Sequence, residues 1–222
     1  MTARALQSRI RKRAAKAGVV IPSQLADQLE RYLALLTRWN AKINLTAFDL
    51  NDPRDEALDR LVVEPLVAAK GMADGDRRVI DIGSGSGSPA IPFHLALPET
   101  ILTMVESKTR KAVFLREAAR HLGLQRVHVE TSRFENLLTR PELHESFDVM
   151  TIRAVRVETA TLLTLQALLK SGGELLWFQA GSRDTNSMLK AYPLKLSRTQ
   201  PLVESSGSRL SVFTKQRQGD VR

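Results

Sequence analysis

The sequence predicts an α/β fold in which a helical extension precedes a mostly parallel sheet with an antiparallel hairpin at one edge. Two observations carry this prediction. From residue 78 onward, short apolar segments alternate with helical ones, and such β-α alternation is typical of a doubly wound sheet. Before residue 72, apolar side chains recur only at helical spacing. We therefore expect a helical extension over 1–72 and a Rossmann-like domain over 73–222.

The predicted extension contains two helices. The first covers 22–39, where Pro22 and Ser23 precede leucines spaced three and four residues apart. The second runs from Pro53 to Ala69 with its leucines and valines facing inward. A polar and apolar corner over 39–46 joins the two helices.

The α/β region is expected to follow one repeating order. Strands are predicted at 79–82, 101–106, 127–131, 147–152 and 174–179, with helices at 89–97, 109–122 and 157–170 and a further short helix at 185–189. The chain then closes with two β segments, 194–203 and 210–214, around a Ser-Gly turn. That ending indicates an antiparallel hairpin at one edge of the sheet.

The composition is that of a globular protein, with 43% hydrophobic and 26% charged residues. No apolar run approaches the ~20 residues needed to cross a bilayer, and the first 20 residues lack the apolar core of a secretory signal. There is no cysteine, which excludes disulfides, cysteine-ligated metals and cysteine nucleophiles. The four histidines show no metal-ligand spacing. We expect a metal-free, cytoplasmic monomer that does not associate with membranes.

Positive charge is concentrated at the two ends of the chain. The net charge is +9, yet residues 1–20 hold six Lys and Arg without an acid, and residues 181–222 hold eight against three acids. Such ends favour a polyanionic partner, because each contact with a phosphate releases counterions. The alternative is a solvated basic face. The N-terminal segment is expected to be either a helix stripe or an arm that becomes ordered on RNA.

A glycine-rich stretch, VIDIGSGSGSPAIP at 79–92, joins the first predicted strand to the helix after it. Gly83, Gly85 and Gly87 lack Cβ atoms, so a ligand can lie against the backbone. In open α/β sheets, ligands bind outside the carboxyl ends of strands, and the first βα turn is the usual place. This position favours a ligand-binding loop over a flexible linker.

Two acidic residues bear on which ligand the loop binds. The glycines from Gly85 onward also fit the dinucleotide pattern G-x-G-x-x-A. However, Asp81 precedes the first glycine, where a carboxylate would repel a pyrophosphate and suit a cation. Glu106, at the end of the second strand, could hold ribose hydroxyls. Together they indicate S-adenosylmethionine. Alternatively, Asp81 is a turn or capping residue and Glu106 an exposed strand end.

Several motifs, taken together, resemble those of one family. They are residues 81–92, then Trp39-Asn40 with Asn44-Leu45-Thr46, Arg110-Lys111 with Phe114-Leu115, Ser132-Arg133-Phe134-Glu135, and Arg153-Ala154. The combination is similar to the RsmG (GidB) methyltransferases, which methylate N7 of a guanine in 16S ribosomal RNA. The resemblance spans Ser23 to the final hairpin.

The resemblance implies a class I S-adenosylmethionine-dependent methyltransferase fold and a 16S ribosomal RNA or small-subunit partner, bound through the basic terminal segments. It also implies a set of cofactor contacts and two positioning candidates. The implied cofactor contacts are Gly83, Ser88, Phe134, Glu135 and Arg153, with Glu106 on the ribose, and the positioning candidates are Arg133 and Arg153. Either arginine could instead hold a strand end through an ion pair. No catalytic residue is predicted, because guanine N7 has a free lone pair and bears no proton.

The sequence departs from the family pattern at a few positions on the predicted substrate side. Where the family has R-H-x-x-D-S, residues 60–65 read RLVVEP, with Leu61 and Glu64 in place of histidine and aspartate. Ile152 replaces a serine and Ala180 a lysine. Three functions therefore stay open: a guanine-N7 ribosomal RNA methyltransferase, a methyltransferase acting on another RNA, a small molecule or a protein, and a non-catalytic RNA-binding assembly protein.

Overall fold

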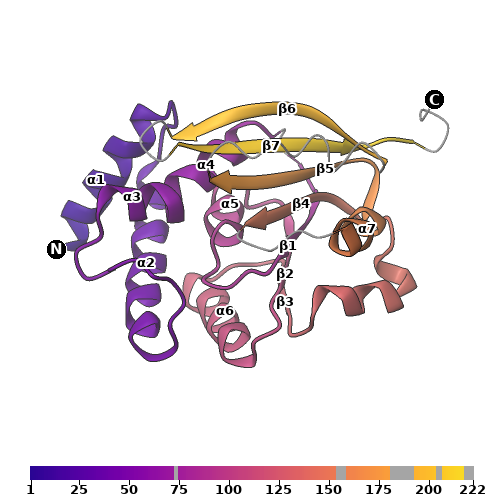
Figure 1. The fold of residues 1–222 in the computed structure, drawn as a ribbon. Coiled ribbons are helices and arrows are strands. Elements are labelled where there is room, and N and C mark those ends of the chain that lie inside the picture. The colour runs from indigo at the N-terminus through magenta and orange to yellow at the C-terminus, as the bar shows by residue number, and fades with distance from the viewer. Residues whose placement is uncertain (73–74, 154–158, 181–192, 204–206, 218–222) are drawn as a thin grey trace.

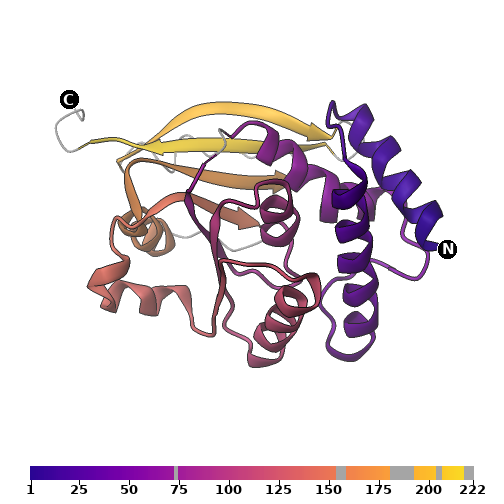
Figure 2. The same ribbon diagram turned by 180° about the vertical axis from the view of Figure 1, so that it is seen from behind.

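In the described part of the chain, seven strands form one sheet with helices packed on both of its faces (Figures 1 and 2). The computed structural model describes residues 1–72, 75–153, 159–180, 193–203 and 207–217. The order of strands across the sheet is β3-β2-β1-β4-β5-β7-β6. The helix predicted at 185–189 lies outside the described residues.

The strands confirm the predicted α/β class and its edge hairpin. They are β1 Arg78–Ile82, β2 Ile101–Val105, β3 Val127–Glu130, β4 Phe147–Arg153, β5 Leu169–Ala180, β6 Leu194–Val203 and β7 Ser208–Lys215. The first five are parallel, whereas β7 runs antiparallel to β5 and β6 antiparallel to β7. β5 begins at Leu169, five residues earlier than the expected 174, because its first residue already pairs with Phe147 of β4.

The helices differ from the prediction mainly in the N-terminal region. They are α1 Ala3–Lys16, α2 Ser23–Ile43, α3 Asp55–Leu58, α4 Glu64–Lys70, α5 Ala90–Ala96, α6 Thr109–Leu122 and α7 Thr159–Leu168, with a π-helical turn η1 Asp59–Val63 and 3₁₀ turns η2 Phe134–Thr139 and η3 Pro141–Leu143. The single helix expected over 53–69 is therefore divided by a π turn. No helix in the described segments is long and apolar enough to cross a membrane.

Two hydrophobic clusters lie on opposite faces of the sheet. Val79 of β1 belongs to the cluster formed with α1, α2, α4, α5 and α6, whereas the next residue, Ile80, belongs to the cluster formed with α7 and η2. This alternation follows from the two-residue period of a strand. Figure 2 shows α2, α4, α5 and α6 together on one side of the sheet. The predicted division at residue 72 falls in the connection between α4 and β1.

The Trp39–Thr46 corner ends α2 and has a structural role. Asn44 adopts a left-handed conformation with φ 49° at the end of the helix, as asparagine tolerates at such positions. The Asn40 side-chain oxygen accepts hydrogen bonds from the backbone N–H groups of Leu45 and Thr46 at 2.7 and 2.8 Å. Trp39 packs edge-to-face on Phe114 of α6, with ring centroids 5.8 Å apart. The corner therefore fixes α2 against the sheet's helical layer.

The parallel strands bring several predicted site residues to one edge of the sheet. The glycine loop follows β1, Glu106 follows β2, the 132–135 segment follows β3, and Arg153 ends β4. Because β1, β2, β3 and β4 are parallel neighbours, their carboxyl ends lie side by side.

Candidate active site

The glycine loop after β1 adopts a conformation that needs glycine at all three positions. Gly83, Gly85 and Gly87 have φ values of 73°, 49° and 85°, in the left-handed region that L side chains rarely adopt. At Gly87 a Cβ would also lie 2.6 Å from Cδ1 of Ile91. The first turn of the loop is fixed to the next strand, since the Gly83 N–H donates to the Val105 carbonyl at 2.9 Å.

Glu106 holds the middle of this loop. One carboxylate oxygen accepts from the Gly85 N–H at 2.9 Å, and the other accepts from the Lys108 N–H at 2.7 Å. The residue is buried, which argues against the alternative of an exposed strand end. A carboxylate has about four acceptor sites, so Glu106 can still accept hydrogen bonds from a ligand's hydroxyl groups.

A cavity of about 260 Å³ opens beside Glu106. Its lining combines four of the predicted cofactor residues with the candidate Arg133: Gly83, Val105, Glu106, Ser107, Ser132, Arg133, Phe134 and Glu135. The volume is just below the roughly 300–1,000 Å³ typical of whole-ligand pockets, so this cavity fits one part of a ligand. An aromatic ring beside carboxylates suits a nucleoside, with a ring to stack and hydroxyls to bind.

Asp81 supplies a buried negative charge beneath the loop. One carboxylate oxygen accepts from the Thr151 hydroxyl, and the other, Oδ2, is buried without a hydrogen-bond partner among the described residues. Burial raises the pKa of Asp81 from 3.8 to about 6, the nearby Arg153 lowers it, and Glu106 raises it. At neutral pH the carboxylate is therefore mostly ionised. A buried charge with an unsatisfied oxygen is costly, and a cationic ligand would relieve that cost.

Arg153 lies in a buried network at the end of β4. Its guanidinium donates to Glu64 at 2.9 Å, to the Ser88 hydroxyl at 3.1 Å and to the Arg60 carbonyl, and it lies over the ring of Phe178 at 4.4 Å. Burial lowers its pKa to about 10. The ion pair at a strand end, weighed as the alternative for Arg153, is thus present in the structure. Its contact with the cofactor stays a prediction.

The predicted residues therefore form two groups at the carboxyl edge of the sheet. Gly83, Glu106, Phe134, Glu135 and Arg133 line the 260 Å³ cavity. Asp81, Ser88 and Arg153 are buried. Gly85 and Gly87 lie in the loop between Asp81 and Ser88 and determine its conformation.

Three side chains at the site were missed by sequence reasoning. Thr151 binds Asp81, and Glu64 binds Arg153. Tyr32 of α2 is fully buried and donates from its hydroxyl to the Ser86 carbonyl of the glycine loop at 2.8 Å. Tyr32 lies within the helix predicted over 22–39, and the sequence holds no local signal for a contact 54 residues away.

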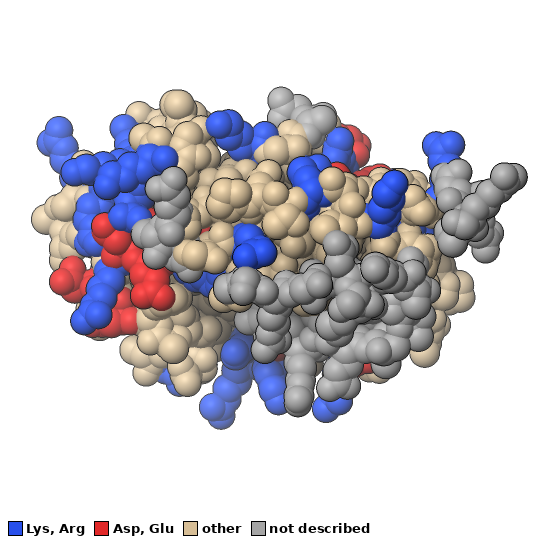
Figure 3. Space-filling model, turned by 45° about the horizontal axis from the view of Figure 1, so that its top comes forward, with Lys and Arg blue, Asp and Glu red and all other residues tan. Residues whose placement is uncertain are grey.

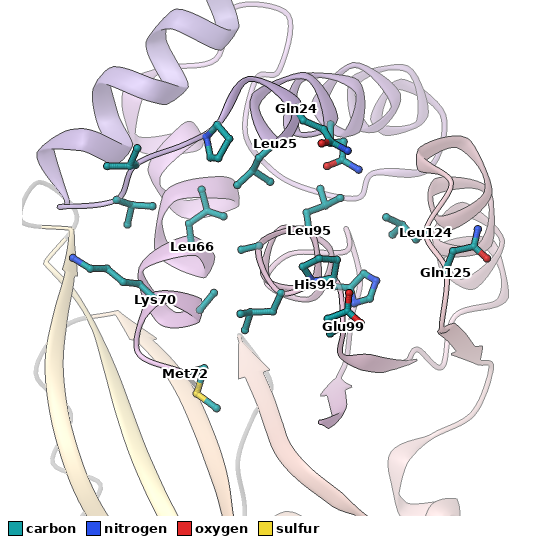
Figure 4. A pocket seen from close by; sticks show the side chains of 18 of the residues that line it. Gln24, Leu25, Leu66, Lys70, Met72, His94, Leu95, Glu99, Leu124 and Gln125 are labelled. Carbon is teal, nitrogen blue, oxygen red and sulfur yellow. The ribbon is translucent and has the colours of Figure 1, made fainter. Parts of the chain in front are cut away.

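Among the described residues, a larger cavity than the one beside Glu106 lies at the amino ends of the parallel strands. It has a volume of about 970 Å³ and is lined by α2, by the end of α4, and by the connections that lead into β2 and β3. Figure 4 shows Leu25, Leu66 and Leu95 facing its interior, with Gln24 and Gln125 at its margin. Connections that precede parallel strands lie at their amino ends, so this cavity is separate from the glycine loop.

The strand order, the glycine loop after β1 and the carboxylate after β2 define a class I S-adenosylmethionine-dependent methyltransferase. Solved structures share this fold. An S-adenosylmethionine-dependent methyltransferase from Aquifex aeolicus has a TM-score of 0.56 at 17% identity, over 74% of this chain and 94% of that one. The [4+2]-cyclase SpnF has a TM-score of 0.61 at 16% identity, over 90% of this chain and 98% of that one.

The chain belongs to the GidB family, rRNA small subunit methyltransferase G, whose model matches residues 25–206. A ribosomal RNA small subunit methyltransferase G from Syntrophotalea carbinolica is 33% identical over 171 residues, which are 77% of this chain and 76% of that protein. One from Xanthomonas axonopodis pv. citri is 39% identical over 160 residues, which are 70% and 69% of the two chains. The resemblance seen in the motifs is thereby confirmed, and the cofactor is S-adenosylmethionine.

Proposed function

We propose that this protein transfers the methyl group of S-adenosylmethionine to N7 of a guanine in 16S ribosomal RNA. Family membership supports the ribosomal RNA substrate. The observation that carries the cofactor site is the unpartnered Asp81 oxygen beneath the three-glycine loop. It offers a negative charge at the place where the cofactor's amino-acid end would lie.

Each predicted residue then has a binding or positioning role. Asp81 would hold the cofactor's ammonium group, and Glu106 its ribose hydroxyls. The cavity beside Phe134 and Glu135 would hold the adenine ring. The bound cofactor supplies an electrophilic methyl group, and guanine N7 attacks it without losing a proton. The protein therefore needs to align the two groups and exclude water, rather than supply a general base.

The N-terminal helix α1 is the proposed RNA-binding surface. Four of its basic side chains, Arg4, Arg11, Lys12 and Lys16, are exposed and form no ion pair with the described part of the chain. The helical conformation of this segment supports a basic helix stripe over an arm that becomes ordered on RNA. Figure 3 shows Lys and Arg side chains clustered at the end of the molecule where α1 lies, beside a smaller acidic group.

Part of the terminal charge is neutralised inside the protein. Arg9 and Arg13 of α1 pair with Asp55 and Asp59. In the C-terminal region, Lys215 is buried and pairs with Glu145, and Arg198 pairs with Glu174. We therefore expect α1 to make more of the RNA contacts than the C-terminal strands do. We also propose that the protein acts as a cytoplasmic monomer.

The methyl acceptor is tested by mass spectrometry of 16S ribosomal RNA from cells with and without the gene. N7-methylguanosine should disappear without the gene and return when purified protein and S-adenosylmethionine are added to the unmodified RNA or small subunits. Unchanged modification in the deletion strain would rule out this acceptor. RNA binding without any methyl transfer would favour an assembly role instead.

The α1 surface is tested by the salt dependence of RNA affinity. Replacing Arg4, Arg11, Lys12 and Lys16 with glutamine should reduce the slope of log affinity against log salt by up to about 3–3.6, because each phosphate contact contributes roughly 0.7–0.9. A matched variant with Lys42→Gln and Arg120→Gln, exposed on α2 and α6, should leave the slope within about one unit of the wild type. An unchanged slope in the α1 variant would refute this surface.

A further inference from the structure

Glu64 joins two segments that are far apart in sequence. It lies at the start of α4 and is fully buried. Its Oε2 accepts from Arg153 at 2.9 Å and from Arg60 at 3.3 Å, and its Oε1 accepts from the Ser208 hydroxyl at 2.6 Å. One carboxylate thus links α4, the end of β4 and the start of β7.

The π turn η1, directly before Glu64, contacts Arg153 and Ser88. The carbonyl of Arg60 accepts from Arg153, and the carbonyl of Leu61 accepts from the Ser88 hydroxyl at 2.9 Å. π turns within α-helices are rare and are frequent at functional sites. Here the turn and Glu64 together surround the guanidinium of Arg153.

Through Arg153 this network reaches the end of the glycine loop. Arg153 donates to the Ser88 hydroxyl at 3.1 Å, and Ser88 directly precedes Pro89, the residue that caps α5. Ser88 is itself buried. The loop is therefore held at both ends, by the Val105 carbonyl at Gly83 and by Arg153 and Leu61 at Ser88.

We infer that Glu64 is a positioning residue for the cofactor: by fixing Arg153 it holds Ser88, and with it the glycine loop, in the form that binds S-adenosylmethionine. This inference rests on the proposed cofactor site at the loop. Glu64 contacts Arg153, which in turn contacts Ser88, so its effect on the loop passes through Arg153.

Glu64 also forms an ion pair with Arg153, which partly neutralises the charge of its guanidinium. The Nε of Arg153 and the Oδ2 of Asp81 are both buried and lack partners among the described residues, and the two charges are close enough to influence each other. Without Glu64, Asp81 becomes an available counter-ion for Arg153. An arginine that neutralises Asp81 would compete with the cofactor's ammonium group.

The test replaces Glu64 with glutamine and measures S-adenosylmethionine binding by calorimetry. We expect the dissociation constant to rise at least tenfold. In turnover assays, KM for the cofactor should rise at least tenfold while KM for RNA changes less than twofold, a split that general destabilisation would not produce. If Glu64→Gln does not fold, Glu64→Asp keeps the charge on a shorter side chain and should raise the dissociation constant by a smaller factor.

The matched control is Lys215→Met. Lys215 ends strand β7, whereas Ser208, which contacts Glu64, begins it. Lys215 is also buried and pairs with Glu145, so its loss should lower the melting temperature comparably while leaving cofactor affinity within twofold. Equal weakening by both variants, or unchanged affinity in Glu64→Gln, would overturn the inference. Asp81→Asn identifies which idea failed: if it also leaves affinity unchanged, the loop is not the cofactor site.

Discussion

Replacing Asp81 with asparagine should stabilise the empty protein while weakening cofactor binding. The folded protein holds Asp81 in a buried position that raises its pKa from 3.8 to about 6. Each pKa unit corresponds to about 1.4 kcal/mol, so at pH 7 the ionised carboxylate costs the folded state about 3 kcal/mol. Asparagine removes this charge and can still accept the hydrogen bond from the Thr151 hydroxyl. The free energy of unfolding at pH 7 should therefore rise by up to about 3 kcal/mol.

The stability gained by Asp81→Asn should depend on pH. Between about pH 4 and 6 the folded wild type binds more protons at Asp81 than the unfolded chain does, so this residue lowers stability as the pH rises. The gain from Asp81→Asn should shrink to roughly half of that value at pH 5 and to less than about 1 kcal/mol at pH 4. Urea unfolding at pH 4, 5 and 7 measures all three values.

Cofactor binding should change in the opposite direction. The ammonium group needs the ionised carboxylate, so the wild-type affinity for S-adenosylmethionine should fall about tenfold for each pH unit below 6. Asp81→Asn should bind weakly at every pH and lose this dependence. If Asp81→Asn binds the cofactor as tightly as the wild type, or is less stable at pH 7, Asp81 is not the buried carboxylate that binds the cofactor's ammonium group.

Two further predictions concern stability and use neighbouring or similar residues as controls. Gly87→Ala should lower the free energy of unfolding in urea by about 2–4 kcal/mol, because of the left-handed backbone and the clash with Ile91. Gly123 is also left-handed but lies in open space, so Gly123→Ala should lower it by only about 1 kcal/mol. Equal losses in the two variants would contradict the packing argument. Arg13→Met removes the ion pairs that Arg13 forms with Asp59 and Asp55 and should lower the free energy of unfolding by at least about 1.5 kcal/mol. The adjacent Lys12→Met should change the free energy of unfolding by less than about 0.5 kcal/mol yet weaken RNA binding. If Lys12→Met were the more destabilising of the two variants, or Arg13→Met the one that weakens RNA binding more, the assignment of Arg13 to an ion pair and Lys12 to RNA would be refuted.

The sheet and the glycine loop could be predicted because their signals are local in sequence. A buried strand, three glycines and a proline within fourteen residues indicate a βα turn, whatever the rest of the chain does. The positions of Asp81 and Glu106 near the carboxyl ends of β1 and β2 could be predicted for the same reason, because each lies at the end of an apolar segment. The parallel arrangement then brings both carboxylates to one edge.

Contacts between distant segments could not be predicted from one sequence. Glu64 and Arg153 are 89 residues apart, and no local pattern links a helix residue to a strand end. The π turn was missed because its inward valines and leucines have nearly the spacing of an ordinary helix. The burial of Lys215 could not be predicted, because a count of lysines cannot distinguish a buried lysine from an exposed one.

The structure also changes how the departures from the family pattern should be interpreted. Leu61 is buried in the core and serves the site through its backbone carbonyl, which any residue supplies. Glu64 still provides a carboxylate, and that carboxylate holds Arg153. Ile152 is a buried core residue of β4. Leu61 and Glu64 therefore support the loop, and Ile152 the core, without requiring the family's side chains, whereas Ala180 is exposed at the carboxyl end of β5. A different methyl acceptor would have to be recognised at that exposed end of the sheet, so Ala180→Lys is the substitution that should alter acceptor affinity while leaving cofactor affinity unchanged.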